Sequence, residues 1–206
     1  MPEQPLRSSL RAEQVLQTRS ALIAAGRRLF GRQGFAATSV EDVARDARVT
    51  TGALYHHFPN KTALFETVFQ EIHTELMEAS AQASAQATDE LGVLADGFEG
   101  FLDAVLKPEV QQILIIDAPA VLGLARFTEL DERGAVAAIV ALLQTATKAG
   151  RMSVEDPETT ARLLLGALTR GAMLIAGSAD PRATRDAVAR AIRAMLAGLA
   201  TGPALR

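Results

Sequence analysis

The stretch TSVEDVARDARVTTGALYHHFPNK, residues 38–61, is the most informative part of this 206-residue chain. Thr38 and Ser39 precede an apolar-periodic run, and Thr38 with Glu41 has the capping-box pattern, so a helix is expected to begin there. The buried face of that helix is expected to consist of Val40, Val43, Ala44 and Ala47, which recur at helical spacing. This face is narrow, so the helix needs a neighbour.

A second short helix is expected directly after a break at Val49. Thr50 is a good N-cap, and the helix is predicted to run from Thr51 to His56 or His57. Pro59 ends it, because the residue before a proline disfavours the helical region. Two such helices joined by a short turn form a helix-turn-helix unit, here residues 39–58, whose second helix can enter the major groove of DNA.

The second helix divides into an inner and an outer face. Leu54 and Phe58 are expected to point inward, and the outer face is left with Thr50, Thr51, Ala53, Tyr55 and His56. Hydroxyls, an imidazole ring and backbone amides are typical phosphate and sugar contacts. Gly52 costs about 1 kcal/mol against Ala in a helix, and close approach of its backbone to DNA is one reason to keep it.

The next helix is expected to be capped by Asn60. Lys61 in its first turn puts a cation beside the positive helix N-terminus, which is unfavourable for the helix alone and useful where a phosphate docks. His57 is interpreted as a core histidine, since it lies beside Phe58 on the inward side. His73 receives no functional interpretation, because it lacks a metal-ligand partner at the four-residue spacing of a zinc helix.

At these residues the chain resembles the TetR family of bacterial transcriptional regulators. The resemblance is carried by Thr18, Arg19, Ala24, Leu29, Phe30, Gly34, Phe35, Thr38, Ser39, Val40, Val43, Ala44, Ala47, Val49, Thr50, Gly52, Leu54, Tyr55, His57, Phe58, Lys61 and Leu64. This ordered and ungapped match spans about a quarter of the chain and is more specific than a single short motif. One departure is Arg48, where many members have Gly in the turn.

The resemblance implies a ligand-responsive regulator, most often a repressor, that binds double-stranded operator DNA as a homodimer through its last two helices. The predicted DNA-binding residues are Thr38, Ser39, Arg48, Thr50, Thr51, Gly52, Ala53, Tyr55, His56 and Lys61. Two recognition helices are expected to lie in successive major grooves, roughly 34–36 Å apart or a multiple of this.

Charge is divided unevenly along the chain. The net charge is −3, yet residues 1–61 hold nine Lys or Arg against five Asp or Glu, and the remainder holds twelve against nineteen. This asymmetry is expected if only the N-terminal part meets phosphate. The absence of cysteine excludes disulfides and thiolate metal sites and fits a cytoplasmic protein. No signal peptide or membrane span is predicted.

The remaining pattern predicts an all-α chain of about nine helices. Residues 1–12 are interpreted as a flexible arm, 13–76 as the DNA-binding domain and 77–206 as a ligand-binding and dimerisation domain. Helices are expected over 13–33, from Asn60 past Leu76, and then over 89–106, from Pro108, 131–148, 157–177 and 182–199. The stretch ASAQASAQAT, residues 79–88, is expected to be a frayed helix end or a loop.

An apolar pocket is predicted in the second domain. Its expected lining is Phe98, Phe101, Leu102, Val105, Ile113, Ile116, Asp117, Val121, Phe127, Thr169 and Met173, which fits a small amphipathic ligand and equally fits plain core. Asp117 must be paired, solvent-facing or capping a helix, and capping the segment opened by Pro119 is the preferred interpretation.

Two other function classes remain as alternatives. An enzyme is disfavoured, because the chain contains no nucleophile elbow, P-loop, dinucleotide fingerprint, zinc helix or paired carboxylates on an apolar helix. No cofactor and no metal are therefore expected. A helical DNA-binding or architectural module without a small-molecule ligand is the second alternative.

Overall fold

The computed structural model describes residues 4–200 and their side chains from Glu13 onward. Its elements are α1 (Gln4–Ala37), α2 (Val40–Asp46), α3 (Thr51–His57), α4 (Lys61–Ala83), α5 (Glu90–Val105), α6 (Pro108–Val110), the π-helix η1 (Gln111–Asp117), α7 (Ala118–Leu122), α8 (Leu124–Glu132), α9 (Ala135–Lys148), α10 (Pro157–Ala176) and α11 (Pro181–Ala197). Within residues 4–200 the only β-type pairing is an isolated bridge between Met152 and Ala200. The all-α prediction is confirmed.

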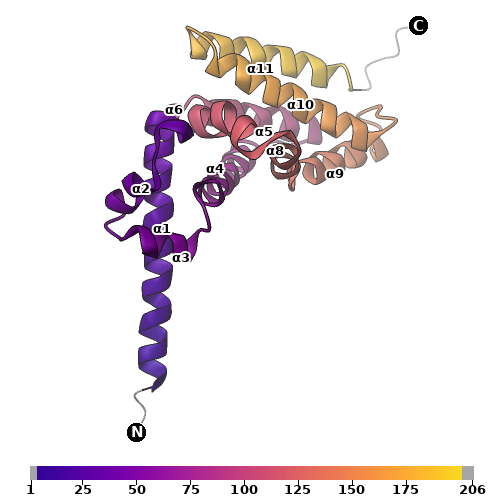
Figure 1. The fold of residues 1–206 in the computed structure, drawn as a ribbon. Coiled ribbons are helices and arrows are strands. Elements are labelled where there is room, and N and C mark those ends of the chain that lie inside the picture. The colour runs from indigo at the N-terminus through magenta and orange to yellow at the C-terminus, as the bar shows by residue number, and fades with distance from the viewer. Residues whose placement is uncertain (1–3, 201–206) are drawn as a thin grey trace, which may run out of the picture.

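The helices form two parts joined by α4 (Figure 1). Helices α1, α2 and α3 lie at one end, and α10 and α11 lie together at the other end, above α5, α8 and α9. Helix α4 leaves the first part and packs along α5 in the second. None of the helices in the described part of the chain is long and apolar enough to cross a membrane.

Three phenylalanines make the centre of the first part. The rings of Phe30 and Phe65 lie 5.3 Å apart edge to face, and Phe35 lies 5.2 Å from Phe65. Leu22 and Leu54 are fully buried with them. Aromatic pairs in these arrangements add about 0.5–1.5 kcal/mol each beyond their buried area, so this cluster fixes how α1 and α4 cross.

The predicted boundaries hold best around α2 and α3. The capping box of α2 is formed by Ser39 and Asp42, one residue later than the predicted Thr38 and Glu41. Thr50 caps α3 as predicted, with its hydroxyl accepting a hydrogen bond from the Ala53 amide at 3.1 Å. The shift by one residue arises because Thr38 is buried and its hydroxyl is used elsewhere.

Three predicted boundaries are corrected. Residues 4–12 of the predicted flexible arm are helical: α1 begins at Gln4, because no Gly or Pro lies between Pro5 and Glu13, and residues 1–3 lie outside the described residues. The helix predicted from 131 begins at Ala135, because Gly134 has a φ of 80°. The segment from Pro108 is divided into α6, η1, α7 and α8, with Gly123 at a φ of 76°.

The low-complexity stretch from residue 79 is more ordered than predicted. Helix α4 continues to Ala83, and a Cβ placed on Gly100 of α5 would lie 2.6 Å from Ala83 Cβ and 3.0 Å from the Ala79 carbonyl oxygen. Two helices that approach this closely need small residues at the crossing. The alanines and serines of this stretch therefore serve the close packing of α4 on α5.

The turn between α2 and α3 contains the one described non-glycine residue with positive φ, Arg48 at 57°. The Val49 amide donates to the Ala44 carbonyl and the Arg48 amide to the Arg45 carbonyl. These two bonds form a Schellman motif, whose left-handed position is usually Gly. A side chain in this conformation costs about 1–2 kcal/mol.

Replacing Arg48 with Gly is therefore expected to raise the free energy of unfolding by about 1 kcal/mol, measured by urea denaturation. Arg48→Ala is the matched control, because it removes the same charge and keeps the strain. An equal gain in both variants would show that charge, not backbone conformation, is responsible.

Candidate functional site

Helix α3 presents one exposed face. Thr51, Gly52, Tyr55 and His56 are exposed, and the Tyr55 side chain is 53% accessible although it is a large aromatic residue. Leu54 on the opposite face is fully buried. Thr50 is also exposed, whereas Ala53 is half-buried. The predicted outer face is thus brought together on one side of a two-turn helix.

Gly52 lies on the first turn of α3 and faces open space. A Cβ placed there would have only the Thr50 hydroxyl oxygen within 4 Å, at 3.8 Å. No packing among the residues that the structure describes therefore requires a glycine at this position. The surface here allows a ligand to approach the backbone closely.

Three residues predicted to contact DNA are engaged inside the protein. Thr38 is 1% exposed, and its hydroxyl donates to the Gly34 carbonyl at 2.8 Å. The Ser39 hydroxyl is half-buried in the α2 capping box. The Lys61 ammonium donates to the carbonyls of Phe35 and Thr38, each at 2.8 Å. The prediction that the Thr38 side chain contacts DNA is corrected, because this side chain is buried and its hydroxyl is bonded inside the protein.

Lys61 shows why a cation lies at the start of α4. Its ammonium group also lies 4.1 Å from the centre of the Phe35 ring. The carbonyls that it binds belong to the last turn of α1 and to the residue just after it, where helical partners are missing. Lys61 thus ties α4 to the end of α1, which is a structural role that the sequence did not indicate.

The positive charge around α2 is largely paired. Arg28 binds Asp46 through its Nη2 atom at 2.6 Å, and Arg45 binds Asp42. The pKa of Asp42 lies below its usual value, first because the Ser39 hydroxyl donates to it and then because of the Ser39 amide and Arg45. Arg48, which is exposed, forms no ion pair within the described residues. Only a small surplus of positive charge is available beside α3.

The C-terminal side of α3 is covered by Arg19 of α1. Its guanidinium lies 4.4 Å from the centre of the Phe58 ring and donates to the His57 carbonyl at 3.5 Å. The pKa of His57 is lowered, first by burial and then by His56 and Arg19. His57 is half-buried, in agreement with its interpretation as a structural histidine.

Asp117 connects the two parts of the molecule. Its carboxylate accepts a hydrogen bond from the Phe35 amide at 2.8 Å, and it makes no cap bond at the start of α7. The predicted capping role and the predicted place in a ligand pocket are both wrong. The Phe35 amide follows Gly34, whose φ of 81° turns the chain at the end of α1, and a carboxylate satisfies this amide.

A second contact between the two parts is an ion-pair cluster around Arg27 of α1. Arg27 binds Glu75 of α4 through Nη2 at 2.8 Å and Glu109 of α6 at 2.7 Å. These carboxylates raise the pKa of Arg27, with the hydrogen bond to Glu75 as the largest cause. Charge-assisted bonds of this kind are stronger than neutral ones, so α6 and η1 are held against α1.

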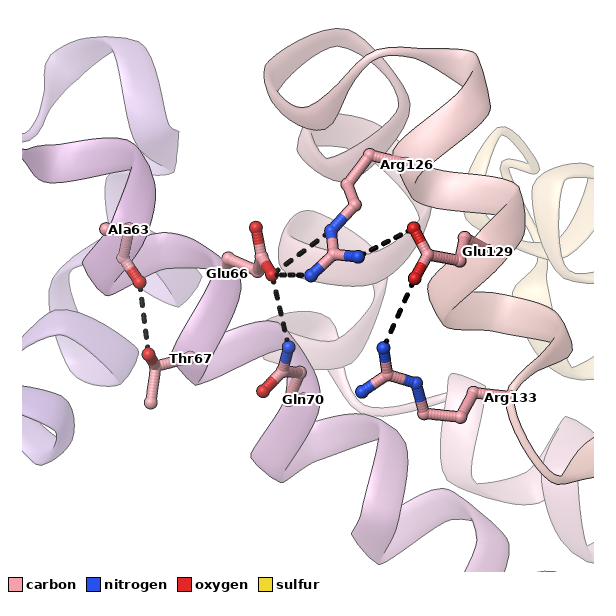
Figure 2. Close-up of polar contacts among 7 residues, drawn as sticks. All are labelled: Ala63, Glu66, Thr67, Gln70, Arg126, Glu129 and Arg133. Carbon is pink, nitrogen blue, oxygen red and sulfur yellow. Dashed lines mark hydrogen bonds and ion pairs between the residues drawn. The ribbon is translucent and has the colours of Figure 1, made fainter.

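Helix α4 is also joined to α8 by polar side chains (Figure 2). Arg126 of α8 reaches Glu66 of α4, with its Nε atom 3.2 Å from Oε1, and it binds Glu129 at 2.6 Å. Arg133 adds a bond to Glu129. One turn further along α4, the rings of Phe69 and Phe127 meet edge to face at 6.1 Å.

The second part contains an apolar cavity of about 230 Å³. It lies between α4, α5, α9 and α10, and its walls include Met77, Phe98, Phe101, Ile139 and Leu168. Phe98 and Phe101 are members of the predicted lining. A cavity with mostly apolar walls is typical of a site for a small organic molecule.

One end of this cavity is polar and was missed by the sequence analysis. His73 of α4 and Asp131 of α8 both line the cavity. The His73 ring stacks on the ring of Phe69, with the two ring centres 5.9 Å apart. Burial lowers the pKa of His73 and raises that of Asp131. The two residues are 58 positions apart, so no local sequence pattern could pair them.

The other predicted lining residues divide into three groups. Phe127, Thr169 and Met173 border a neighbouring cavity of about 230 Å³ that also touches Asp131. Leu102, Val105 and Ile113 are fully buried core and line neither cavity, and Ile116 is 52% exposed. Val121 is half-buried. None of these last five residues lines either cavity, which corrects their predicted place in the lining, because helical spacing cannot separate a cavity wall from packed core.

Two family models match the chain. Residues 22–68 match the model described as bacterial regulatory proteins, tetR family, and residues 91–199 match the model described as tetracyclin repressor-like, C-terminal domain. The second match alone spans more than half of the 206 residues. The two matches coincide with the two parts of the structure.

Similar proteins are known by structure and by sequence. A TetR-family transcriptional regulator from Pectobacterium atrosepticum has 32% identity and a TM-score of 0.81, with coverage of 93% of this chain and 98% of that chain. The transposon Tn10 TetC protein of Escherichia coli is 23% identical over 75% of this chain and 78% of its own length. The regulator TtgR of Pseudomonas putida is 37% identical over 40% of either chain.

Removing the Asp117 carboxylate tests the link between the two parts. Asp117→Ala is expected to lower the free energy of unfolding by about 1–3 kcal/mol, because the Phe35 amide loses its acceptor. Asp117→Asn is the control, since its amide oxygen can still accept this bond, and it is expected to lose less. Urea denaturation measures both, and equal losses in the two variants would contradict this role.

Proposed function

The chain belongs to the TetR family of bacterial transcriptional regulators, and we propose that it is a dimeric repressor released from operator DNA by a small apolar or amphipathic molecule. The single observation that carries this proposal is the placement of α4. Its first residue, Lys61, holds the turn behind α3, and its later residue His73 lines the apolar cavity. One rigid element thus spans the DNA-binding surface and the effector cavity.

The DNA-binding surface is proposed to be the exposed face of α3. Thr50, Thr51, Tyr55 and His56 offer hydroxyl and imidazole groups to phosphates or base edges. Arg48 adds an unpaired cation at the preceding turn. The Lys61 ammonium group is shared between two carbonyls, so we propose that Lys61 acts mainly by positioning α3 and not by the DNA contact that the sequence predicted.

A dimer is proposed to form through α10 and α11. Leu163 and Leu174 on α10 are 68% and 48% exposed, and Met195 on α11 is 50% exposed. Gly166 lies between the two leucines on the exposed face of α10, with nothing within 4 Å of a Cβ placed there. Exposed apolar residues with small residues between them suit close packing of a second copy across a twofold axis.

Effector binding is proposed to act through α4 and η1. A ligand between α4, α5, α9 and α10 would displace α4, and a small tilt of a long helix becomes a larger displacement at its end. Asp117 and the Arg27 cluster would resist this tilt, because they hold the end of α1 against η1 and α6. A ligand shifts the balance between the DNA-binding and the released conformations only by the difference in its affinity for the two.

Gly52→Ala tests the DNA surface. It is expected to stabilise the free protein by up to about 1 kcal/mol, because Ala favours a helix over Gly, while specific DNA affinity falls by about tenfold or more because the methyl group blocks the backbone. Thermal unfolding and gel shift with selected genomic fragments measure the two effects. Unchanged affinity would exclude close approach at Gly52, and no preference for any sequence would refute the regulator.

Leu174→Arg tests the dimer. A charge at the centre of the proposed interface is expected to give a monomer by sedimentation and to weaken operator binding by about 100-fold, since two linked reading helices bind together. The control is Leu124→Arg, a change at a leucine on α8 that is 77% exposed and lies outside α10 and α11. A dimer that survives Leu174→Arg would place the interface elsewhere.

A further inference from the structure

The polar end of the effector cavity contains acceptors and no cation. His73 and Asp131 are its titratable residues, and Ser80 and Ser84 are the remaining polar side chains in a wall made of aliphatic and aromatic groups. No Lys or Arg lines this cavity among the residues that the structure describes. The walls therefore contain one carboxyl group and no Lys or Arg beside it.

The hydrogen bonds of Asp131 leave room for a donor. The Thr169 hydroxyl donates to its Oδ2 atom at 3.2 Å, and this is the one side-chain hydrogen bond of the carboxylate within the described part of the chain. A carboxylate has about four lone-pair positions. Thr169 also donates to the Leu165 carbonyl at 3.0 Å, so its single hydrogen is shared and satisfies Asp131 only partly.

His73 adds a second acceptor beside the first. Its ring is hydrogen-bonded to the backbone of Asp131, a contact that favours the protonated ring. Burial acts in the opposite direction and is the larger influence on its pKa. A neutral imidazole that uses one nitrogen as a donor has the other as an acceptor. Two acceptors then lie at the same end of the cavity.

We propose that the effector is a small hydrophobic organic cation, whose ammonium group binds Asp131 and His73 and whose apolar body fills the space against Phe98 and Phe101. This inference rests on the proposed function and specifies the ligand class for its cavity. A buried carboxylate with only one, shared side-chain hydrogen bond is costly, and an ammonium group supplies both charge and donors. The same carboxylate repels an anionic ligand.

The size and walls of the cavity agree with this class. A volume of about 230 Å³ exceeds the roughly 150 Å³ cavity that holds benzene, which leaves room for one ring and a short amine chain. Phe98 and Phe101 give the apolar body of such a ligand aromatic surfaces to pack against. The neighbouring cavity beside Thr169 leaves Asp131 accessible from a second side.

The first test uses the wild-type protein and three probes with one skeleton. Phenethylamine, phenethyl alcohol and phenylacetic acid share a ring and two carbons and differ in charge. Titration calorimetry at neutral pH is expected to show the amine binding about tenfold or more tightly than the alcohol, and the acid binding weakest. Equal affinity for amine and alcohol, or tighter binding of the acid, would overturn the proposal.

The second test uses Asp131→Asn, which keeps the shape and an acceptor for Thr169 and removes the charge. The preference for the amine over the alcohol is expected to disappear in this variant. Glu132→Gln is the matched control, because it removes an adjacent acid that does not line this cavity, and the preference should persist. A preference retained in Asp131→Asn would overturn the proposal.

The experiments distinguish a failure of the proposed ligand class from a failure of the proposed function as a DNA-binding regulator. Ligand preference is measured without DNA. Thermal unfolding of each variant without ligand, compared with that of the wild type, checks that the variant is folded. A gel shift of a selected operator fragment, with and without phenethylamine, then measures release. Amine binding without any specific DNA binding would refute the proposed function alone, whereas specific DNA binding with no charge preference in the cavity would refute this inference alone.

Discussion

The arrangement of the whole molecule depends on how the backbone of Phe35 is held. Its amide donates to Asp117 of η1, and its carbonyl accepts from Lys61 of α4. Both bonds involve a charged group, so both are stronger than ordinary backbone bonds. The end of α1 is thereby tied to η1 and to α4, and this pair of bonds forms the joint between the three elements.

This joint also explains the irregular backbone around it. Gly34 turns the chain with a positive φ, and η1 widens from an α-helix to a π-helix where Asp117 and Gln112 meet that turn. π-helical segments occur often at functional sites. Here the irregular backbone of η1 brings the Asp117 carboxylate to the Phe35 amide, which has no helical partner. This amide keeps its hydrogen bond only while η1 stays in place.

The cavity and the joint are connected through the face of α4 that meets α8. Glu66 binds Arg126, Phe69 meets Phe127, and His73 lies with Asp131, so three contacts follow one another along the same pair of helices. The first is close to the DNA-binding part and the last borders the effector cavity. These three contacts join α4 to α8 from Glu66 as far as the residues that line the cavity.

Local signals in the sequence were enough to predict the helices of the first part and the protein family. Capping residues, a proline and helical spacing act within a few residues, so the limits of α3 and the burial of Leu54 and Phe58 could be predicted from local rules. Only the tertiary structure decided the roles of Lys61, Asp117, His73 and Asp131, because each depends on a partner far away in the chain. A charge or an imidazole acquires its function from the groups that surround it, and those groups meet only when the chain has folded.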